Sequence, residues 1–121
     1  MQRKLLFILT KGFEKAGGAT RAFELATLTA KNGNTVEIFL VDDAIHWGQL
    51  GIAEGIRSST GDYMKELIDE LARMKAPVYV CEACAEKRLV TEDDLIFNAE
   101  MAPSAALAEK MADEAYRVFT F

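Results

Sequence analysis

Two cysteines lie three residues apart in the stretch VYVCEACAEKR (78–88), where an apolar run gives way to a charged one. The spacing is compatible with four roles: a metal clip, a redox pair, one reactive thiol beside a bystander, or two small core residues. A structural zinc site uses four ligands, whereas the chain offers Cys81, Cys84 and its single histidine, His46. We therefore expect no metal, and the other three roles stay open.

The position of the pair favours a reactive thiol. If Cys81 begins a helix, the unpaired N–H groups of the first turn and the helix dipole stabilise a thiolate. Cys84 then shares a helix face with Cys81, so a disulfide can close between them if the helix start adapts. Lys11 from the first crossover and Arg88 at the end of the short helix are candidate sources of positive charge near the sulfur.

His46 and Trp47 lie in the irregular segment after the second predicted strand. One interpretation is a lid over Cys81, in which His46 is a hydrogen-bond partner of the thiol. The other is a contact between subunits, where tryptophan is enriched. Asp42 and Asp43 end the second strand and are interpreted as a solvated strand end rather than as paired catalytic carboxylates.

Apolar runs alternate with helical patterns along the whole chain. This alternation predicts an α/β fold with a mostly parallel sheet of about five strands and helices on both faces. The Cys81–Cys84 segment would then lie at the carboxyl edge of the sheet, where ligands of such folds gather. The predicted strands are Lys4–Thr10, Thr35–Val41, Pro77–Val80, Ile96–Met101 and Tyr116–Phe121.

Capping residues predict where the helices begin. The expected starts are Thr20 for a helix over 21–32, Ser59 with Asp62 in a capping box, Cys81 for a helix ending near Arg88, Thr91 with Asp94, and Ser104. The second helix has a one-sided pattern, with Asp69 and Arg73 as an exposed pair four residues apart. The Gly17–Gly18 segment is interpreted as a simple turn rather than a phosphate-binding loop. The last helix is expected to have a buried face formed by Leu107, Ala108, Met111, Ala112 and Ala115.

Composition limits the classes of function. The chain has 121 residues, half of them hydrophobic, and a formal charge of −5, which predicts one domain over 1–121 and disfavours a nucleic-acid partner. No apolar run approaches the ~20 residues that cross a bilayer, so we expect no membrane association. We expect a cytoplasmic protein, and in such a protein two cysteines in C-x-x-C spacing indicate reactive chemistry or metal binding rather than a structural disulfide.

The segment VYVCEACAEKRLVTEDDL resembles the cysteine segment of the DsrE/DsrF-like family, the sulfur-relay proteins that include the Tus subunits. The similarity extends to the KLLFILT start, to AKNGNTVEIFLV and to ADEAYRVFTF. The resemblance implies a three-layer α/β/α, flavodoxin-like fold assembled as trimers or hexamers. It also implies a persulfide carried on Cys81, with Arg88 matching the basic residue of the family. Leu89 stands where a glycine is common, and Cys84 is an additional thiol that could discharge or protect the carrier.

The predicted function is therefore that of a sulfur carrier, which needs no cofactor and has no turnover of the usual enzymatic kind. Its partners would be a sulfur donor protein, an acceptor protein and further copies of itself. The alternatives are a redox or sensor protein that uses a Cys81–Cys84 disulfide, and a non-catalytic oligomeric binding module.

Overall fold

A computed structural model describes residues 3–121 of the chain. The strands are β1 (Lys4–Leu9), β2 (Val36–Leu40), β3 (Val78–Cys81), β4 (Ala99–Ala102) and β5 (Tyr116–Thr120). The α-helices are α1 (Ala16–Lys31), α2 (Met64–Arg73), α3 (Glu82–Lys87) and α4 (Ser104–Ala112). Three short 3₁₀ helices are η1 (Phe13–Lys15), η2 (Asp42–Gly48) and η3 (Glu92–Asp94). Among these described residues, no helix has both the length and the apolar character needed to cross a bilayer.

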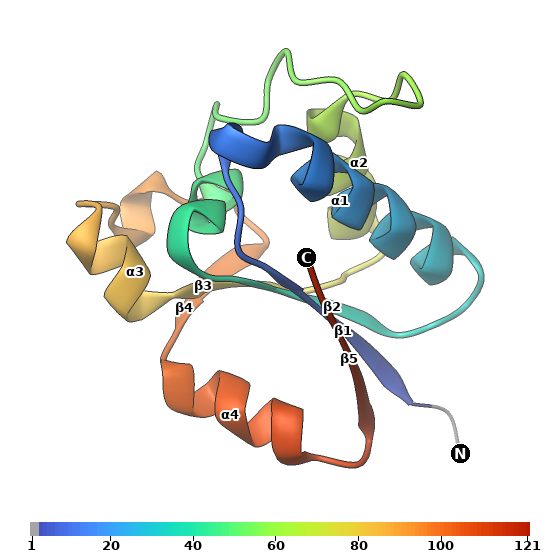
Figure 1. The fold of residues 1–121 in the computed structure, drawn as a ribbon, viewed down its shortest axis with the longest axis vertical. Helices are drawn as coiled ribbons and strands as arrows, with labels where there is room; N and C mark the ends of the chain where they lie inside the picture. The colour runs from blue at the N-terminus through green and yellow to red at the C-terminus, as the bar shows by residue number, and fades with distance from the viewer. Residues whose placement is uncertain (1–2) are drawn as a thin grey trace.

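The five strands form one sheet in the order β4-β3-β2-β1-β5, and every neighbouring pair is parallel. Helices α1 and α2 cover one face and α4 covers the other, whereas α3 lies beyond the end of β3 (Figure 1). The predicted α/β fold of flavodoxin-like arrangement is confirmed. All five strands therefore end at one edge, which brings the segments after β1, β2 and β3 together.

The core lies mainly between the sheet and the α1–α2 layer. All five residues of β2 are buried, as expected for a central strand of a parallel sheet that is covered on both faces. The predicted inward face of α2 is confirmed, because its apolar residues at i, i+3, i+4 and i+7 spacing are all buried. Each such side chain contributes ~1.5–3 kcal/mol to folding, and in α2 they are Met64, Leu67, Ile68 and Leu71.

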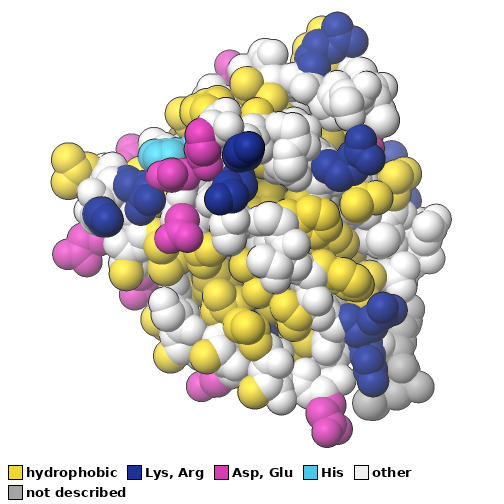
Figure 2. Space-filling model, in the orientation of Figure 1, with side chains coloured by type: hydrophobic (Ala, Val, Ile, Leu, Met, Phe, Trp, Pro, Cys, Tyr) yellow, Lys and Arg dark blue, Asp and Glu magenta, His cyan; other side chains and the backbone are white. Residues whose placement is uncertain are grey.

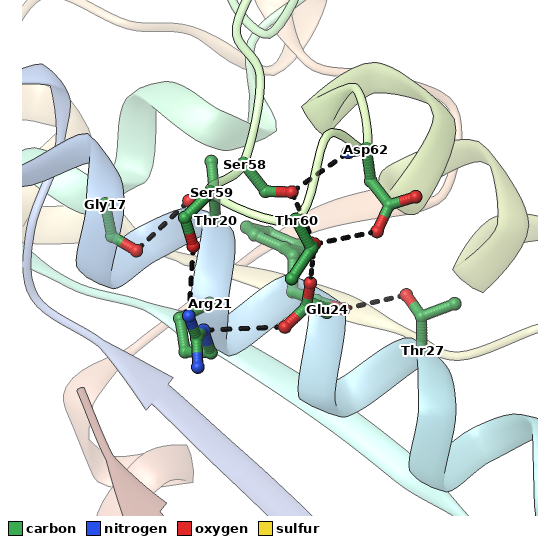
Figure 3. Close-up of polar contacts among 10 residues, drawn as sticks. Gly17, Thr20, Arg21, Glu24, Thr27, Ser58, Ser59, Thr60 and Asp62 are labelled. Atoms are coloured by element: carbon green, nitrogen blue, oxygen red, sulfur yellow. Dashed lines mark hydrogen bonds and ion pairs between the residues drawn. The ribbon is translucent and has the colours of Figure 1, made fainter.

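The first helix begins earlier than its predicted cap. Helix α1 starts at Ala16, and Thr20 lies buried inside it, with its hydroxyl donating to the carbonyl of Gly17 at 3.0 Å (Figure 3). A threonine can satisfy its hydroxyl on the preceding turn of a helix, so a residue that resembles a cap also fits an interior position. The expected turn at Gly17–Gly18 is therefore wrong, since both glycines are helical.

The capping box predicted at Ser59 and Asp62 is also wrong, because α2 begins at Met64 with Tyr63 as its N-cap. The polar residues of this segment instead stabilise a loop. The Asp62 N–H donates to the Ser58 hydroxyl at 3.1 Å. Figure 3 shows that the same loop reaches α1, where the Thr60 hydroxyl donates to the Glu24 carboxylate. Short polar side chains favour turns and caps alike, and here tertiary contacts with α1 decide between them.

Three smaller expectations differ in outcome. The Thr91–Asp94 capping box is confirmed at η3. The predicted pair between Asp69 and Arg73 on α2 is wrong, because Asp69 pairs with Lys65 and Arg73 pairs with Glu70. The fourth strand is shorter than predicted and begins at Ala99 rather than Ile96, because the Ile96 N–H is engaged by the carbonyl of Gly48 in η2.

The last helix packs less deeply than its sequence predicts. None of the residues of α4 is fully buried, and three that were expected to face inward, Ala108, Met111 and Ala112, are exposed. A polar contact secures the helix instead: Lys110 donates to the carboxylate of Glu37 on β2 at 2.8 Å, and Glu37 is 8% exposed. Burial alone would lower the pKa of Lys110, but its hydrogen bonds to Glu37 and Tyr116 raise that pKa well above its usual range.

We expect Lys110→Met to lower the free energy of unfolding by about 3 kcal/mol, because it leaves the buried Glu37 carboxylate with the Tyr116 hydroxyl but without a positive charge beside it. The double variant Lys110→Met/Glu37→Gln should recover a large part of that loss. Lys65→Met, which removes the exposed ion pair with Asp69, is the matched control and should leave stability nearly unchanged. Urea unfolding measures all three, and equal effects at Lys110 and Lys65 would contradict the anchoring role of Lys110.

Candidate functional site

Cys81 is the last residue of β3 and the N-cap of α3. At this junction the backbone leaves the sheet and immediately enters a helix, so the first free amides of α3 lie beside the cysteine side chain. The residue is 3% exposed in the single chain, and its neighbour on β4 is Ala102. The sulfur is thus almost completely shielded, although it lies at the edge of the sheet where the crossovers converge.

Several donors act on the Cys81 sulfur. Burial raises the pKa of its thiol, but the backbone amides of Cys84 and Ala83 and the side chains of Cys84 and Ser104 outweigh burial and lower that pKa. The amides do not form a capping hydrogen bond of ordinary geometry with the side chain, so they act mainly as dipoles directed at the charge. The Ser104 hydroxyl lies 3.9 Å from the sulfur, which connects the start of α4 with this site.

Cys84 has a different environment from Cys81. It is partly exposed and unpaired, and it lies close enough to Cys81 for each thiol to affect the pKa of the other. Its sulfur accepts a hydrogen bond from the Asp42 N–H at 3.2 Å and lies 4.0 Å from the Asp42 carboxylate. Burial raises the pKa of the Cys84 thiol, and the Cys81 sulfur and the Asp42 carboxylate raise it further, against the Asp42 N–H. The pKa of the Cys81 thiol is therefore lower than that of a free cysteine, and the pKa of the Cys84 thiol is higher.

Arg88 lies next to the cysteine pair. Its guanidinium donates to the carboxylate of Asp43 and, at 3.2 Å, to the backbone carbonyl of Cys84. It therefore joins α3 to η2 rather than contacting the Cys81 sulfur. Leu89, which follows it, has a φ of 59°. The turn thus adopts the left-handed conformation that suits a glycine, although this chain carries a leucine there.

Lys11 and His46 are not brought to the sulfur. Among residues 3–121, the groups that lower the pKa of Cys81 come from α3 and from Ser104. His46 Nδ1 is instead 2.6 Å from Oε1 of Gln49. The contribution of Lys11 is its backbone carbonyl, which accepts a hydrogen bond from Trp47 Nε1 at 2.8 Å. Trp47 itself is buried, so it packs η2 against the first loop.

Two residues that the sequence did not single out for the site now lie in it. Ser104 was expected only to start a helix, but the pairing of β3 with β4 places the residues after both strands side by side. Asp42 was interpreted as a solvated strand end, yet its backbone reaches Cys84. The available signal was the strand order, because the ends of β2, β3 and β4 are neighbours in the sheet.

A separate cavity of about 250 Å³ is lined by Trp47 of η2, Ile68 of α2 and residues 96–98. Neither cysteine lines it, so its chemistry is not that of the thiol pair. Within residues 3–121, no three His, Cys, Asp or Glu side chains converge in a way that could hold a metal ion.

The fold and the site define a flavodoxin-like α/β protein with a polarised thiol pair at the carboxyl edge of its sheet. A sequence profile described as the DsrE/DsrF-like family matches residues 3–121. The chain belongs to the DsrE/DsrF-like family. Comparison with curated protein sequences gave no match.

Two solved structures support the same fold. The YchN protein from E. coli is 22% identical, with a TM-score of 0.83, and the alignment covers 100% of both chains. The protein MTH1491 from Methanobacterium thermoautotrophicum, described as of unknown function, is 10% identical with a TM-score of 0.69, again over 100% of both chains. At these identities the likeness concerns the fold.

We expect the alkylation rate of Cys81 to rise at lower pH than that of Cys84, because the local donors lower the pKa of the first thiol while that of the second is raised. Ser104→Ala should move the Cys81 profile to higher pH and slow its alkylation at neutral pH about twofold, as befits a weak hydroxyl donor. Ser104→Thr, which keeps the hydroxyl, is the control. Iodoacetamide labelling followed by peptide mass spectrometry separates the two thiols, and coincident profiles would contradict the assignment.

Proposed function

We propose that this protein carries sulfane sulfur as a persulfide on Cys81. The observation on which the proposal rests is the arrangement of the Cys81 thiol, which ends β3 with the amides of α3 directed at it in a chain of the DsrE/DsrF-like family. A lowered thiol pKa raises the fraction of thiolate, and the thiolate is the species that attacks sulfane sulfur. The persulfide that results also carries negative charge, which the same donors stabilise.

The burial of Cys81 shapes how sulfur would reach it. Cys81 itself is almost inaccessible to solvent, whereas the nearby Cys84 is partly exposed. Sulfur would approach along the side on which Cys84 reaches solvent, carried on a slender group such as a polysulfide or a donor persulfide. Such shielding also protects a bound persulfide from unrelated thiols, which is useful to a protein that hands sulfur from a donor protein to an acceptor protein.

A redox or sensor role is the second candidate, and it is favoured because the two thiols lie close enough to affect each other's pKa. In that role Cys81 and Cys84 would form a disulfide on mild oxidation and open it on reduction. Both roles suit the cytoplasm, where thiols are kept reduced. The carrier role needs only Cys81, whereas the redox role needs both Cys81 and Cys84.

We expect Cys84→Ser protein, reduced and then treated briefly with inorganic polysulfide, to gain about 32 Da, the mass of one sulfur. Cys81→Ser protein should gain far less, because burial and the Asp42 carboxylate raise the pKa of the Cys84 thiol and so lower its thiolate fraction. Treatment with a small thiol should remove the adduct and restore the original mass. Intact mass spectrometry reads all three states. An unloaded Cys84→Ser protein, or equal loading of both variants, would refute the carrier role of Cys81.

We also propose that copies of this chain associate, as the family resemblance implies, in trimers or hexamers. Uncovered apolar surface supports this proposal. Figure 2 shows hydrophobic side chains gathered across the middle and lower part of one face, while charged side chains lie mostly toward its margins. Two of the large exposed apolar residues are Phe97 at 89% and Leu89 at 87% exposure. Large uncovered apolar areas are typical of interfaces.

Sedimentation equilibrium should therefore give a mass of three or six times the 13.4 kDa of the chain. Phe97→Asp should lower that mass or make it depend on protein concentration, because a buried carboxylate without a partner opposes association. Lys87→Asp, a change at a residue that is already charged and exposed, is the control. A mass of one chain for the unmodified protein would contradict the proposal.

A further inference from the structure

The turn that contacts Cys84 has a strained backbone. Among residues 3–121, three residues other than glycine have a positive φ: Asp42 at 51°, Lys75 at 60° and Leu89 at 59°. Lys75 and Leu89 directly follow the C-caps of α2 and α3, where a left-handed residue commonly ends a helix. Asp42 instead follows β2 as the first residue of η2, so no helix C-terminus accounts for its conformation. Strain of this kind persists where the surroundings impose it, often at functional sites.

The residue after Asp42 makes two tertiary contacts that restrain the turn. A Cβ atom at Gly12 would lie 2.6 Å from the Asp43 carbonyl oxygen, so the loop after β1 can pass over this turn only because Gly12 has no side chain. The turn also meets the C-terminal end of α3, where Arg88 donates to the Asp43 carboxylate. The contacts of Asp43 restrain this turn, and the left-handed conformation of Asp42 places both its N–H and its carboxylate beside Cys84.

The groups that face Cys84 keep it different from Cys81. The charged or titratable neighbours are Cys81 itself, Asp42 from η2 and, one step away, the Asp43–Arg88 pair. The Asp42 carboxylate and the Cys81 sulfur oppose a negative charge on Cys84. Cys84 therefore stays a protonated thiol while Cys81 is the nucleophile that takes up sulfur. An oxygen of the Asp42 carboxylate lies 4.0 Å from the Cys84 sulfur.

We propose that Cys84 resolves a sulfur-loaded Cys81, with the Asp42 carboxylate accepting the Cys84 proton. This inference rests on the proposed carrier function and adds a second outcome for the carried sulfur, namely its release as sulfide inside one chain. The trigger is chemical: once Cys81 is a persulfide, its Sγ is an electrophile, and the Cys84 thiol lies one helical turn away.

The step balances without an external oxidant. The Cys84 sulfur loses its proton to Asp42 and attacks Cys81 Sγ, so a bond forms between the two cysteine sulfurs. The bond between Cys81 Sγ and the outer sulfur breaks, and the outer sulfur leaves with the electron pair and takes up the proton that Asp42 accepted, so it departs as hydrosulfide. The outer sulfur is reduced to sulfide and the cysteine pair is oxidised to a disulfide. An external dithiol reductant then returns the pair to its starting state.

The local geometry permits this disulfide. Side chains three residues apart at a helix start have Cβ atoms ~5–6 Å apart, and a disulfide needs ~4 Å. Cys81 lies outside the helix as its N-cap, with an extended ψ of 120°, so a small rotation there closes the distance without unwinding α3. The burial of Cys81 also favours an internal attacker over a thiol from solution.

The test loads reduced protein with inorganic polysulfide, removes the excess by desalting, and follows free sulfide and intact mass. Wild type should release about one sulfide per chain and end about 2 Da below the dithiol form, whereas Cys84→Ser should keep the adduct of about 32 Da. Failure of Cys84→Ser to load at all would refute the carrier function itself. Loading of both proteins without release from wild type would overturn only the resolving role.

Asp42→Asn tests the proton acceptor. Asparagine adopts the left-handed conformation readily and keeps the N–H, so this change removes little besides the carboxylate charge. Sulfide release should slow about tenfold or more near neutral pH, and the deficit should shrink toward pH ~10, where solvent removes the thiol proton. Asp43→Asn is the matched control and should stay within about twofold of wild type.

Three results would overturn the inference. One is release from Asp42→Asn that equals or exceeds wild type, since the carboxylate would then act only by opposing the Cys84 charge. Another is a deficit that persists unchanged at high pH, which indicates a structural defect. The third is an outer sulfur found on Cys84 by peptide fragmentation with no sulfide released, since this shows that Cys84 attacks the outer atom.

Discussion

The transition from β3 to α3 at Cys81 is the constraint on which the site depends. Because a parallel strand runs directly into a helix there, the amides of the first turn have no backbone partners and are directed at the cysteine side chain. The same transition fixes Cys84 one turn on, where it faces the turn after β2 instead. One local feature of the backbone therefore gives two chemically identical residues opposite tendencies to ionise.

That local feature would have little effect without the strand order. The sheet places β3 between β2 and β4, so the segments that follow these strands converge on α3. The turn after β2 supplies Asp42, and the connection after β4 supplies Ser104. The first loop acts less directly, since Gly12 lets it pass over Asp43. The chemistry of the thiol pair is thus a property of the assembled sheet edge rather than of the C-x-x-C spacing.

The sequence predicted the fold well because its strongest signals are hydrophobic. Continuous apolar runs specify buried parallel strands, and the α2 pattern specifies an inward face; both agree with the structure. Cap residues were less reliable at Thr20 and Ser59, since a short polar side chain can bond to a helix turn or to a distant loop equally well. The position of Cys81 followed from topology. The contact between Cys84 and Asp42, in contrast, depends on the left-handed backbone conformation of Asp42, which no residue pattern predicts.

The weak packing of α4 has a consequence for the site. This helix carries Ser104 to Cys81, yet its own residues bury little surface, and its firmest connection to the sheet is the bond between Lys110 and Glu37. Hydrophobic contact is diffuse and tolerates sliding, while a buried ion pair fixes direction and distance. Lys110 also lies over the rings of Tyr79 and Tyr116, which restricts its movement further. The bond between Lys110 and Glu37 therefore sets the distance between the Ser104 hydroxyl, which follows β4, and the Cys81 sulfur at the end of β3.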